Sequence, residues 1–95
     1  MVSRLNAWAL VSRAAAYVQA LGGAGNILSI EARSTRLLLK AVDTARIDEA
    51  ALKAAGARGV VNPAAGSAQV VIGPIAGLLD AEIKAQLRSA RKTAA

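Results

Sequence analysis

The stretch NILSIEARSTRLLL, residues 26–39, carries the clearest fold signal in this chain. It consists of an apolar segment, a polar tip and a second apolar segment, which is the pattern of a β-hairpin. We therefore predict strands at Ile27–Ala32 and Leu37–Val42, joined by a tip at Arg33–Arg36. Arginine and hydroxyl side chains can all donate hydrogen bonds, so this tip is suited to hold an anion.

The two predicted strands differ in how clearly their sequences indicate a strand. In the first, the apolar residues Leu28 and Ile30 alternate with polar residues, as in a strand that buries one face. In the second, the continuous apolar run Leu37–Leu39 is also compatible with a helix by periodicity alone. The shortness of this run and its flanking residues favour a strand.

A helix is predicted before the hairpin, at Ser3–Leu21, because apolar residues recur there at helical spacing. Gly22 and Gly23 end it, since glycine readily adopts the left-handed conformation of a helix C-terminus. We interpret Trp8, on another side of this helix, as a packing residue near the edge of the domain, with a partner contact as the alternative. The apolar face consists of Leu10, Ala14, Tyr17, Val18 and Leu21.

A second helix, at Asp48–Ala55, follows the hairpin. Asp48 can cap it by accepting from the free amides of the first turn, and Gly56 ends it. The next segment predicts a second hairpin, with short strands at Gly59–Val61 and Ala68–Ile72. A turn-rich connection over residues 62–67 joins these two strands.

Gly73-Pro74 is expected to open the last helix, with Pro74 at the first helical position, where a missing amide costs nothing. Asp80 and Lys84 are spaced to form an ion pair on this helix. Its buried stripe is expected to contain Ile75, Leu78, Leu79, Ile83 and Leu87.

The predicted order is helix, strand, strand, helix, strand, strand, helix. Two hairpins and three helices indicate an α/β (α+β) fold, with a four-stranded, mainly antiparallel sheet and the helices on one of its faces. A chain of 95 residues has room for one small core, so we predict a single domain over residues 1–95.

The composition excludes several classes of chemistry. The chain has no cysteine and no histidine, so disulfides, thiolate metal sites, cysteine nucleophiles and histidine bases are ruled out. We expect no cofactor and no metal. No apolar run reaches the roughly 20 residues that span a bilayer, and no signal peptide is expected.

The net charge of +6 and the pI near 10.9 favour anionic partners. Only the end of the chain approaches a basic cluster, which we interpret as a solvated helix end, where cations complement the helix dipole. A basic nucleic-acid-binding module is an alternative, although aromatic stacking platforms and a dense basic stripe are missing from the sequence. The residues of this basic tail are Lys84, Arg88, Arg91 and Lys92.

The hairpin also forms part of a longer signature. Asn26-Ile27 is followed by five residues, one acceptor position and x-Thr-Arg-Leu, with Asp43 ten residues after the acceptor position. This signature resembles the enzyme IIB domains of the glucose and N-acetylglucosamine class of the bacterial phosphoenolpyruvate-dependent sugar phosphotransferase system. The similarity continues in IDEAALKAAGARGV, residues 47–60, and in QVVIGP, residues 69–74. It covers about residues 14–88, which leaves residues 1–13 as a helical extension and residues 89–95 as a basic tail.

The resemblance implies a phosphocarrier, in which a cysteine takes phosphate from a phosphohistidine on a IIA domain and passes it to a sugar held by a membrane IIC domain. The acceptor position is Arg33 here, and its protonated guanidinium cannot act as the nucleophile that covalent transfer needs. Thr35, Arg36 and Gln69 match the family, whereas a second family arginine is replaced by Leu38.

We therefore expect an enzyme IIB-like component that cannot carry phosphocysteine and has a regulatory role, in which it binds a phosphotransferase partner or an anion. The expected partner is a IIA-like protein, a membrane IIC domain or a regulator, and the expected location is the cytoplasm or the inner face of the membrane. The alternatives are an active phosphotransferase component in sugar uptake and, for the tip, an ordinary solvated turn. No catalytic residue is expected, and the expected phosphate- or partner-binding residues are Arg33, Ser34, Thr35, Arg36 and Gln69.

Overall fold

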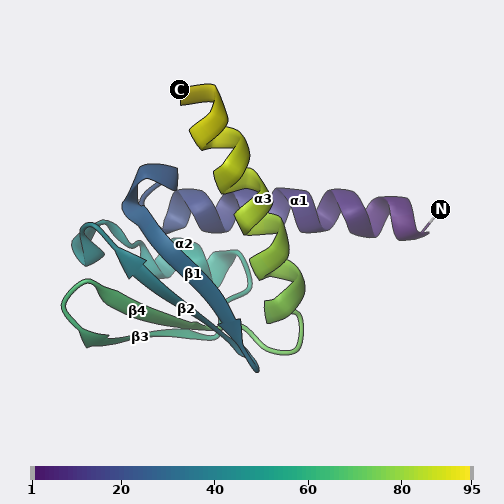
Figure 1. Ribbon diagram of the computed structural model, residues 1–95. Coiled ribbons are helices and arrows are strands. Elements are labelled where there is room, and N and C mark those ends of the chain that lie inside the picture. Colours follow the sequence, from purple (N-terminus) through teal and green to yellow (C-terminus); the bar gives the residue numbers. More distant parts are fainter. Residues whose placement is uncertain (1, 95) are drawn as a thin grey trace.

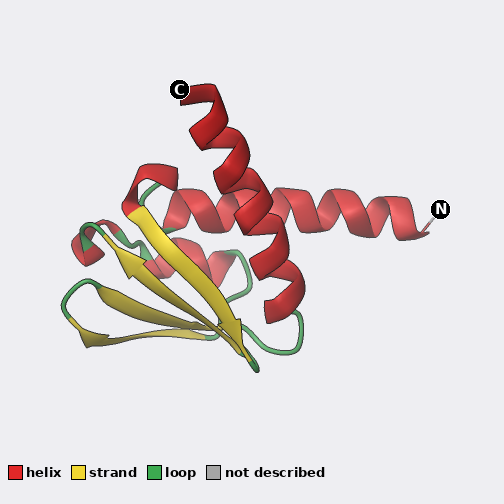
Figure 2. Ribbon diagram, viewed as in Figure 1, coloured by secondary structure: helices red, strands yellow, loops and turns green. Residues whose placement is uncertain are grey.

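The computed structural model describes the backbone of residues 2–94 and the side chains of residues 8–91. Its helices and strands follow the order expected from the sequence (Figures 1 and 2). Short 3-10 turns, η1 (Ala24–Asn26) and η2 (Thr44–Arg46), follow the first helix and the first hairpin. The other elements are α1 (Val2–Ala20), β1 (Ile27–Arg33), β2 (Arg36–Ala41), α2 (Glu49–Ala54), β3 (Gly59–Ala64), β4 (Ser67–Val71) and α3 (Ala76–Ala94).

The four strands form one antiparallel sheet in the order β1-β2-β4-β3. Each hairpin pairs its own two strands, and the pairing of β2 with β4 joins the hairpins at the centre of the sheet. The predicted fold class is therefore confirmed. The expected turn-rich connection at residues 62–67 is largely strand instead, and Pro63 lies in the edge strand β3, where a residue that cannot donate a ladder hydrogen bond is tolerated.

The helices cover one face of the sheet and enclose the core with it (Figure 2). α3 packs on β1 and β2, α2 packs on β3, and α1 contacts both of the other helices. The predicted apolar face of α1 is confirmed, with Leu10 partly buried and the rest of that face buried. The largest fully buried apolar side chains are Tyr17, Leu21, Ile27, Leu37, Leu52, Val70, Leu79 and Ile83.

Asn26 is a fully buried polar side chain at the base of the first hairpin. Its Nδ2 donates to the carbonyl oxygens of Leu21, at 2.8 Å, and Asp43, at 3.0 Å, and its Oδ1 accepts from the Asp43 amide at 2.9 Å. One amide side chain therefore ties the end of α1 to the segment that follows β2. Because these partners satisfy the buried amide, the burial carries no desolvation penalty for an unpaired group.

Leu28 is the main departure from the predicted strand pattern. It is 61% exposed, although simple alternation with Ile30 places it in the core. The pairing of β1 with β2 shifts register between Ile27 and Ser29, which inserts an extra residue at Leu28. Ile27 and Ile30, three positions apart, are therefore both buried, and Leu28 is turned out of the core.

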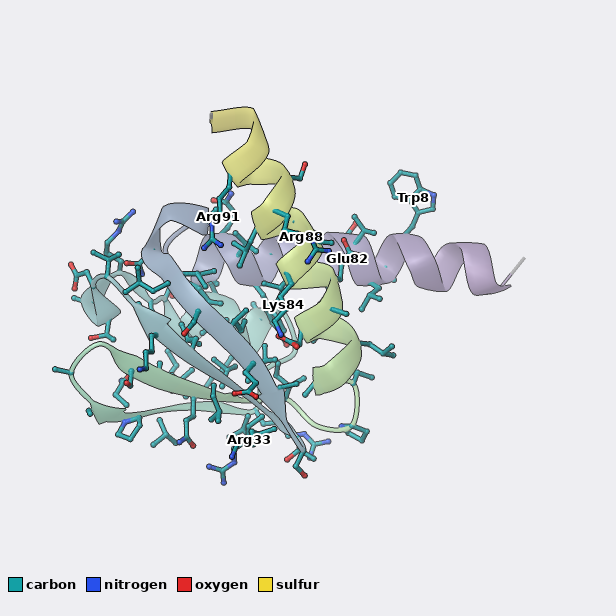
Figure 3. The ribbon with its side chains drawn as sticks, in the orientation of Figure 1. Trp8, Arg33, Glu82, Lys84, Arg88 and Arg91 are labelled. Atoms are coloured by element: carbon teal, nitrogen blue, oxygen red, sulfur yellow. The ribbon has the colours of Figure 1, made fainter. Side chains whose placement is uncertain are left out.

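Three further expectations for the helices need correction. Pro74 precedes α3 rather than opening it, because the helix begins at Ala76. Leu78 is 61% exposed, since the buried stripe of α3 follows Ala76, Leu79, Ile83 and Leu87 at helical spacing and leaves Leu78 beside it. Trp8 is 71% exposed and points away from the sheet, so it does not pack at the domain edge as expected (Figure 3).

Two local features of the helices agree with the sequence. The Asp48 side chain caps α2 by accepting from the Ala51 amide at 3.0 Å. Lys84 Nζ lies 3.0 Å from Asp80 Oδ2, so the predicted i,i+4 ion pair is present on α3. The tail residue Lys92 has its side chain outside the described residues.

Candidate functional site

The tip of the first hairpin is a turn of two residues, Ser34 and Thr35, between the end of β1 and the start of β2. Ser34 has a φ of 56°, which is uncommon for a residue other than glycine. Two-residue hairpins need positive φ in the turn because of the twist of the flanking strands. The short turn therefore places the Ser34 side chain at the apex, exposed to solvent.

A pair of backbone hydrogen bonds anchors the tip to the rest of the domain. The Thr35 carbonyl oxygen accepts from the amides of Ile72 and Gly73, each at 2.9 Å. These two residues lie in the connection from β4 to α3. The tip is thus fixed against the sheet rather than projecting on its own.

Arg33 and Arg36 are direct cross-strand partners in the pairing of β1 with β2. Both side chains are exposed. Arg33 Nη2 lies 4.0 Å from Glu31 Oε2, at the limit of an ion pair. The two arginines concentrate positive charge at one end of the sheet, and a pair of like charges in directly opposed positions is unfavourable.

Gln69, on β4, contacts Arg36 of this pair. Its Oε1 accepts a hydrogen bond from Arg36 Nη1 at 2.9 Å. With its oxygen engaged, Gln69 keeps its amide N–H groups available as donors, and the guanidinium of Arg36 has further N–H groups. The structure thus brings Arg33, Arg36 and Gln69 together on the face of the sheet that the helices leave open.

Leu38 lies beside these polar groups, between Glu31 and Gln69 in the strand register. It is half-buried and borders a depression of about 490 Å³, which Lys84 of α3 also lines. The depression also involves Ser29, Lys40, Pro63 and Ser67. The open face therefore offers an apolar centre next to a cationic end.

Arg58 is a third arginine at this end of the sheet, and the sequence reasoning missed it. A methyl group on Gly73 would lie 3.5 Å from Arg58 Nη2, so the guanidinium rests against Gly73. Gly73 in turn holds the Thr35 carbonyl. Arg58 directly precedes Gly59, where β3 begins. Because β3 is connected to the tip only through its pairing with β4, the position of Arg58 in the sequence is a weak indication that it lies near the tip.

The basic tail lies elsewhere. Lys84, Arg88 and Arg91 are spaced along α3, whereas Arg33 projects at the far end of β1 (Figure 3). Arg91 Nη2 donates to the Ile27 carbonyl at 2.9 Å, so this cation is partly used to hold α3 against β1. Arg91 is therefore not simply a solvated cation at a helix end as expected, whereas Lys84 makes the ion pair with Asp80 that the sequence predicts.

The part of the chain that the structure describes contains no helix that is long and apolar enough to cross a membrane. Among the same residues, no three acidic side chains come together in a way that could hold a metal ion.

The fold matches a domain of known structure. One domain of the PTS system IIabc component from Clostridium difficile superposes with a TM-score of 0.64, over 85% of this chain and 81% of that domain, at 21% sequence identity. No family model matches the sequence. This chain and that domain thus share the same fold.

Relatives with higher identity decide the family. The chain is 48% identical over 75 residues to the PTS system N-acetylglucosamine-specific EIIB component of Streptomyces coelicolor, covering 79% of this chain and 96% of the relative. It is 44% identical over 71 residues to the N-acetylglucosamine-specific EIICB component of Bacillus subtilis, covering 75% of this chain but 16% of that protein. The chain belongs to the enzyme IIB family of the bacterial sugar phosphotransferase system.

Proposed function

We propose that this chain is an enzyme IIB component of an N-acetylglucosamine phosphotransferase system whose tip binds a phosphate group or an acidic partner surface without accepting phosphate covalently. The observation that carries the proposal is the pairing of Arg33 with Arg36 at the tip, where the family resemblance puts the acceptor residue. The N-acetylglucosamine class is that of the relatives with 39–48% identity to this chain.

The chemistry of the tip favours binding over covalent transfer. A guanidinium remains protonated and has no lone pair with which to attack a phosphoryl group. Ser34 is the nearest hydroxyl, but the chain has no histidine that could serve as its base. A bound phosphate, in contrast, would relieve the repulsion between Arg33 and Arg36.

The proposed donor set would surround such an anion from three strands, β1, β2 and β4, and from the turn between β1 and β2. Arginine N–H groups pair well with phosphate oxygens, because charge-assisted hydrogen bonds are about twice as strong as neutral ones. The hydroxyls and the amide of Gln69 add neutral donors. The full set consists of Arg33, Ser34, Thr35, Arg36 and Gln69.

The proposed partners are a phosphorylated IIA domain and a membrane IIC domain, or a regulator with a similar acidic surface. The EIICB and EIICBA relatives support the first two partners, since these proteins carry C and A components in the same chain as the B component. Such partners would place the domain in the cytoplasm, at the inner face of the membrane.

Phosphotransfer from labelled phosphoenolpyruvate through the upstream carriers and a phosphorylated IIA protein tests the proposal. The wild-type chain should stay unlabelled, while Arg33→Cys combined with Leu38→Arg should gain label. The single variant Leu38→Arg serves as the matched control and should stay unlabelled, because it lacks a nucleophile. Stable label on the wild-type chain would contradict the proposal.

A second candidate function, an active component that uses Ser34, is favoured by one observation, the position of Ser34 at the apex of the tip with a φ of 56°. If this hydroxyl accepted phosphate, the wild-type chain would be labelled and Ser34→Ala would not. The nucleic-acid alternative has less support, because Lys84 and Arg91 contact groups of the protein itself.

A further inference from the structure

β1 is an edge strand of the sheet. It pairs with β2 on one side, and within residues 2–94 no strand pairs with its other side. An edge strand presents backbone N–H and C=O groups that can pair with a further strand. α3 runs beside this edge on the helical side of the sheet (Figure 1).

A groove of about 260 Å³ lies between β1 and α3. Leu28 contributes an apolar side chain that is 61% exposed, because the bulge has turned it out of the core. After the bulge, residues 29–33 pair regularly with β2, so most of the edge is straight enough to serve as a template. The groove is bordered by Leu28, Ser29, Lys84, Leu87, Arg88 and Arg91.

The charge along this groove has one sign. Lys84, Arg88 and Arg91 follow each other along α3 (Figure 3), and the acidic residue that contacts them is Asp80, which pairs with Lys84. Arg91 holds the Ile27 carbonyl at the start of β1 and so fixes the C-terminal half of α3 beside the strand. Arg88, between the other two cations, is exposed.

The opposite edge of the sheet lacks these features. β3 contains Pro63, and its pairing with β4 is irregular between Val61 and Ala64. Proline and bulges are common ways in which edge strands avoid pairing with other chains. Each edge strand has one irregularity, at Leu28 in β1 and between Val61 and Ala64 in β3, but β3 also contains Pro63, and α3 with its cations lies beside β1.

We propose that the groove between β1 and α3 binds an extended acidic segment of a partner protein, which adds to β1 as a fifth strand. Backbone hydrogen bonds to residues 29–32 would supply affinity, as in other cases of strand addition. Acidic side chains of the segment would face Lys84 and Arg88, and an apolar side chain would cover Leu28. Ser29, Ile30 and Lys84 line both this groove and the depression beside Gln69, but the groove contains none of the tip residues 33–36, and the proposal does not rest on the function proposed for Arg33.

The probe is a synthetic ten-residue peptide in which Val and Glu alternate, added to the isotope-labelled chain and followed by NMR. The expected result is a change in shift and slower hydrogen exchange at the amides of residues 28–32, with residues 59–64 in β3 unchanged. The same peptide with Pro at every second position cannot donate the ladder hydrogen bonds and should fail to bind. Equal binding of the Pro peptide would overturn the proposal.

Two variants at one exposed position give a matched control. Leu28→Glu should weaken peptide binding by at least about tenfold relative to Leu28→Lys, because like charges then face each other in the groove. Arg88→Glu should weaken binding in the same direction, and the NMR fingerprint of each variant reports its folding. Equal affinities of the two Leu28 variants would overturn the proposal.

Other outcomes point to different ligands. Peptide-induced shifts confined to residues 33–37 would show that the peptide acts as a general anion at the tip, and the groove proposal would fail while the tip proposal stood. Binding to phosphatidylserine vesicles in the absence of peptide binding would assign the α3 cations to a membrane surface, and would also overturn strand addition.

Discussion

Replacing Arg33 with glutamine should stabilise the domain when no anion is bound. Arg33 and Arg36 are directly opposite each other, and like charges in such a pair destabilise a sheet by up to about 1 kcal/mol. Glu31 offsets little of this repulsion, because its Oε2 is 4.0 Å from Arg33 Nη2 and the side chains of Glu31 and Arg33 are 62% and 68% exposed. We expect the free energy of unfolding to rise by about 0.5 kcal/mol at low salt.

Urea unfolding in a buffer of about 10 mM chloride, where screening is weak, measures this difference. Lys40→Gln is the matched control. It removes the same charge from the same face of the neighbouring strand β2, but Lys40 is paired with Ser29 and Ser67 rather than with a cation. The excess stabilisation of Arg33→Gln over Lys40→Gln should largely disappear at about 1 M salt, where the screening length is about 3 Å.

Phosphate should reverse the order of stability. If it binds between the two arginines with a dissociation constant of about 1 mM, then about 10 mM phosphate stabilises the wild-type domain by about 1.4 kcal/mol. Arg33→Gln should gain much less, since it lacks one of the two cations. The reasoning is refuted if Arg33→Gln is less stable than wild type without phosphate, or if phosphate stabilises both proteins equally.

Three further predictions concern the scaffold. Gly22→Ala should destabilise the domain by about 1–3 kcal/mol more than Gly23→Ala in urea unfolding. Both glycines have positive φ, but only at Gly22 would an added Cβ lie 2.6 Å from Asn26 Nδ2. Equal losses of stability in the two variants would refute this clash. Asn26→Ala should lower the free energy of unfolding by about 2–4 kcal/mol, because the buried partners in Leu21 and Asp43 lose their hydrogen bonds; a loss below about 1 kcal/mol contradicts this role. Burial raises the pKa of Tyr17, with Arg13 acting in the opposite direction, so the unfolded chain ionises first and the stability of wild type should fall as pH rises above about 10. Tyr17→Phe should show a smaller fall in pH-dependent thermal unfolding and should cost little at neutral pH, because the Tyr17 hydroxyl is buried without a hydrogen-bond partner in the described structure.

Much of the fold could be predicted because its local signals agree with each other. The polar tip between two apolar runs, the cap at Asp48 and the glycines after α1 and α2 each act within a few residues, and each is found where the sequence places it. Signals of this kind depend on backbone preferences that do not need the rest of the chain.

The misplaced residues depend on contacts that are distant in sequence. Leu28 is exposed because the register of β1 against β2 shifts, and a strand's own alternation cannot reveal a bulge. The exposure of Leu78 depends on where α3 begins, and the exposure of Trp8 depends on how far α1 extends past its neighbours. The same holds at the tip, where the hydrogen bond between Arg36 and Gln69 joins residues 33 positions apart and arises only from the pairing of β2 with β4.

The most direct measurement of the central claim is an NMR titration of the isotope-labelled chain with inorganic phosphate to millimolar concentration, at constant ionic strength. The account predicts that the amides of residues 33–37 and 67–70 shift in a saturable way in wild type, and that these shifts are lost in Arg33→Gln and retained in Lys40→Gln. Amides that stay unchanged across residues 33–37 would contradict an anion-binding tip.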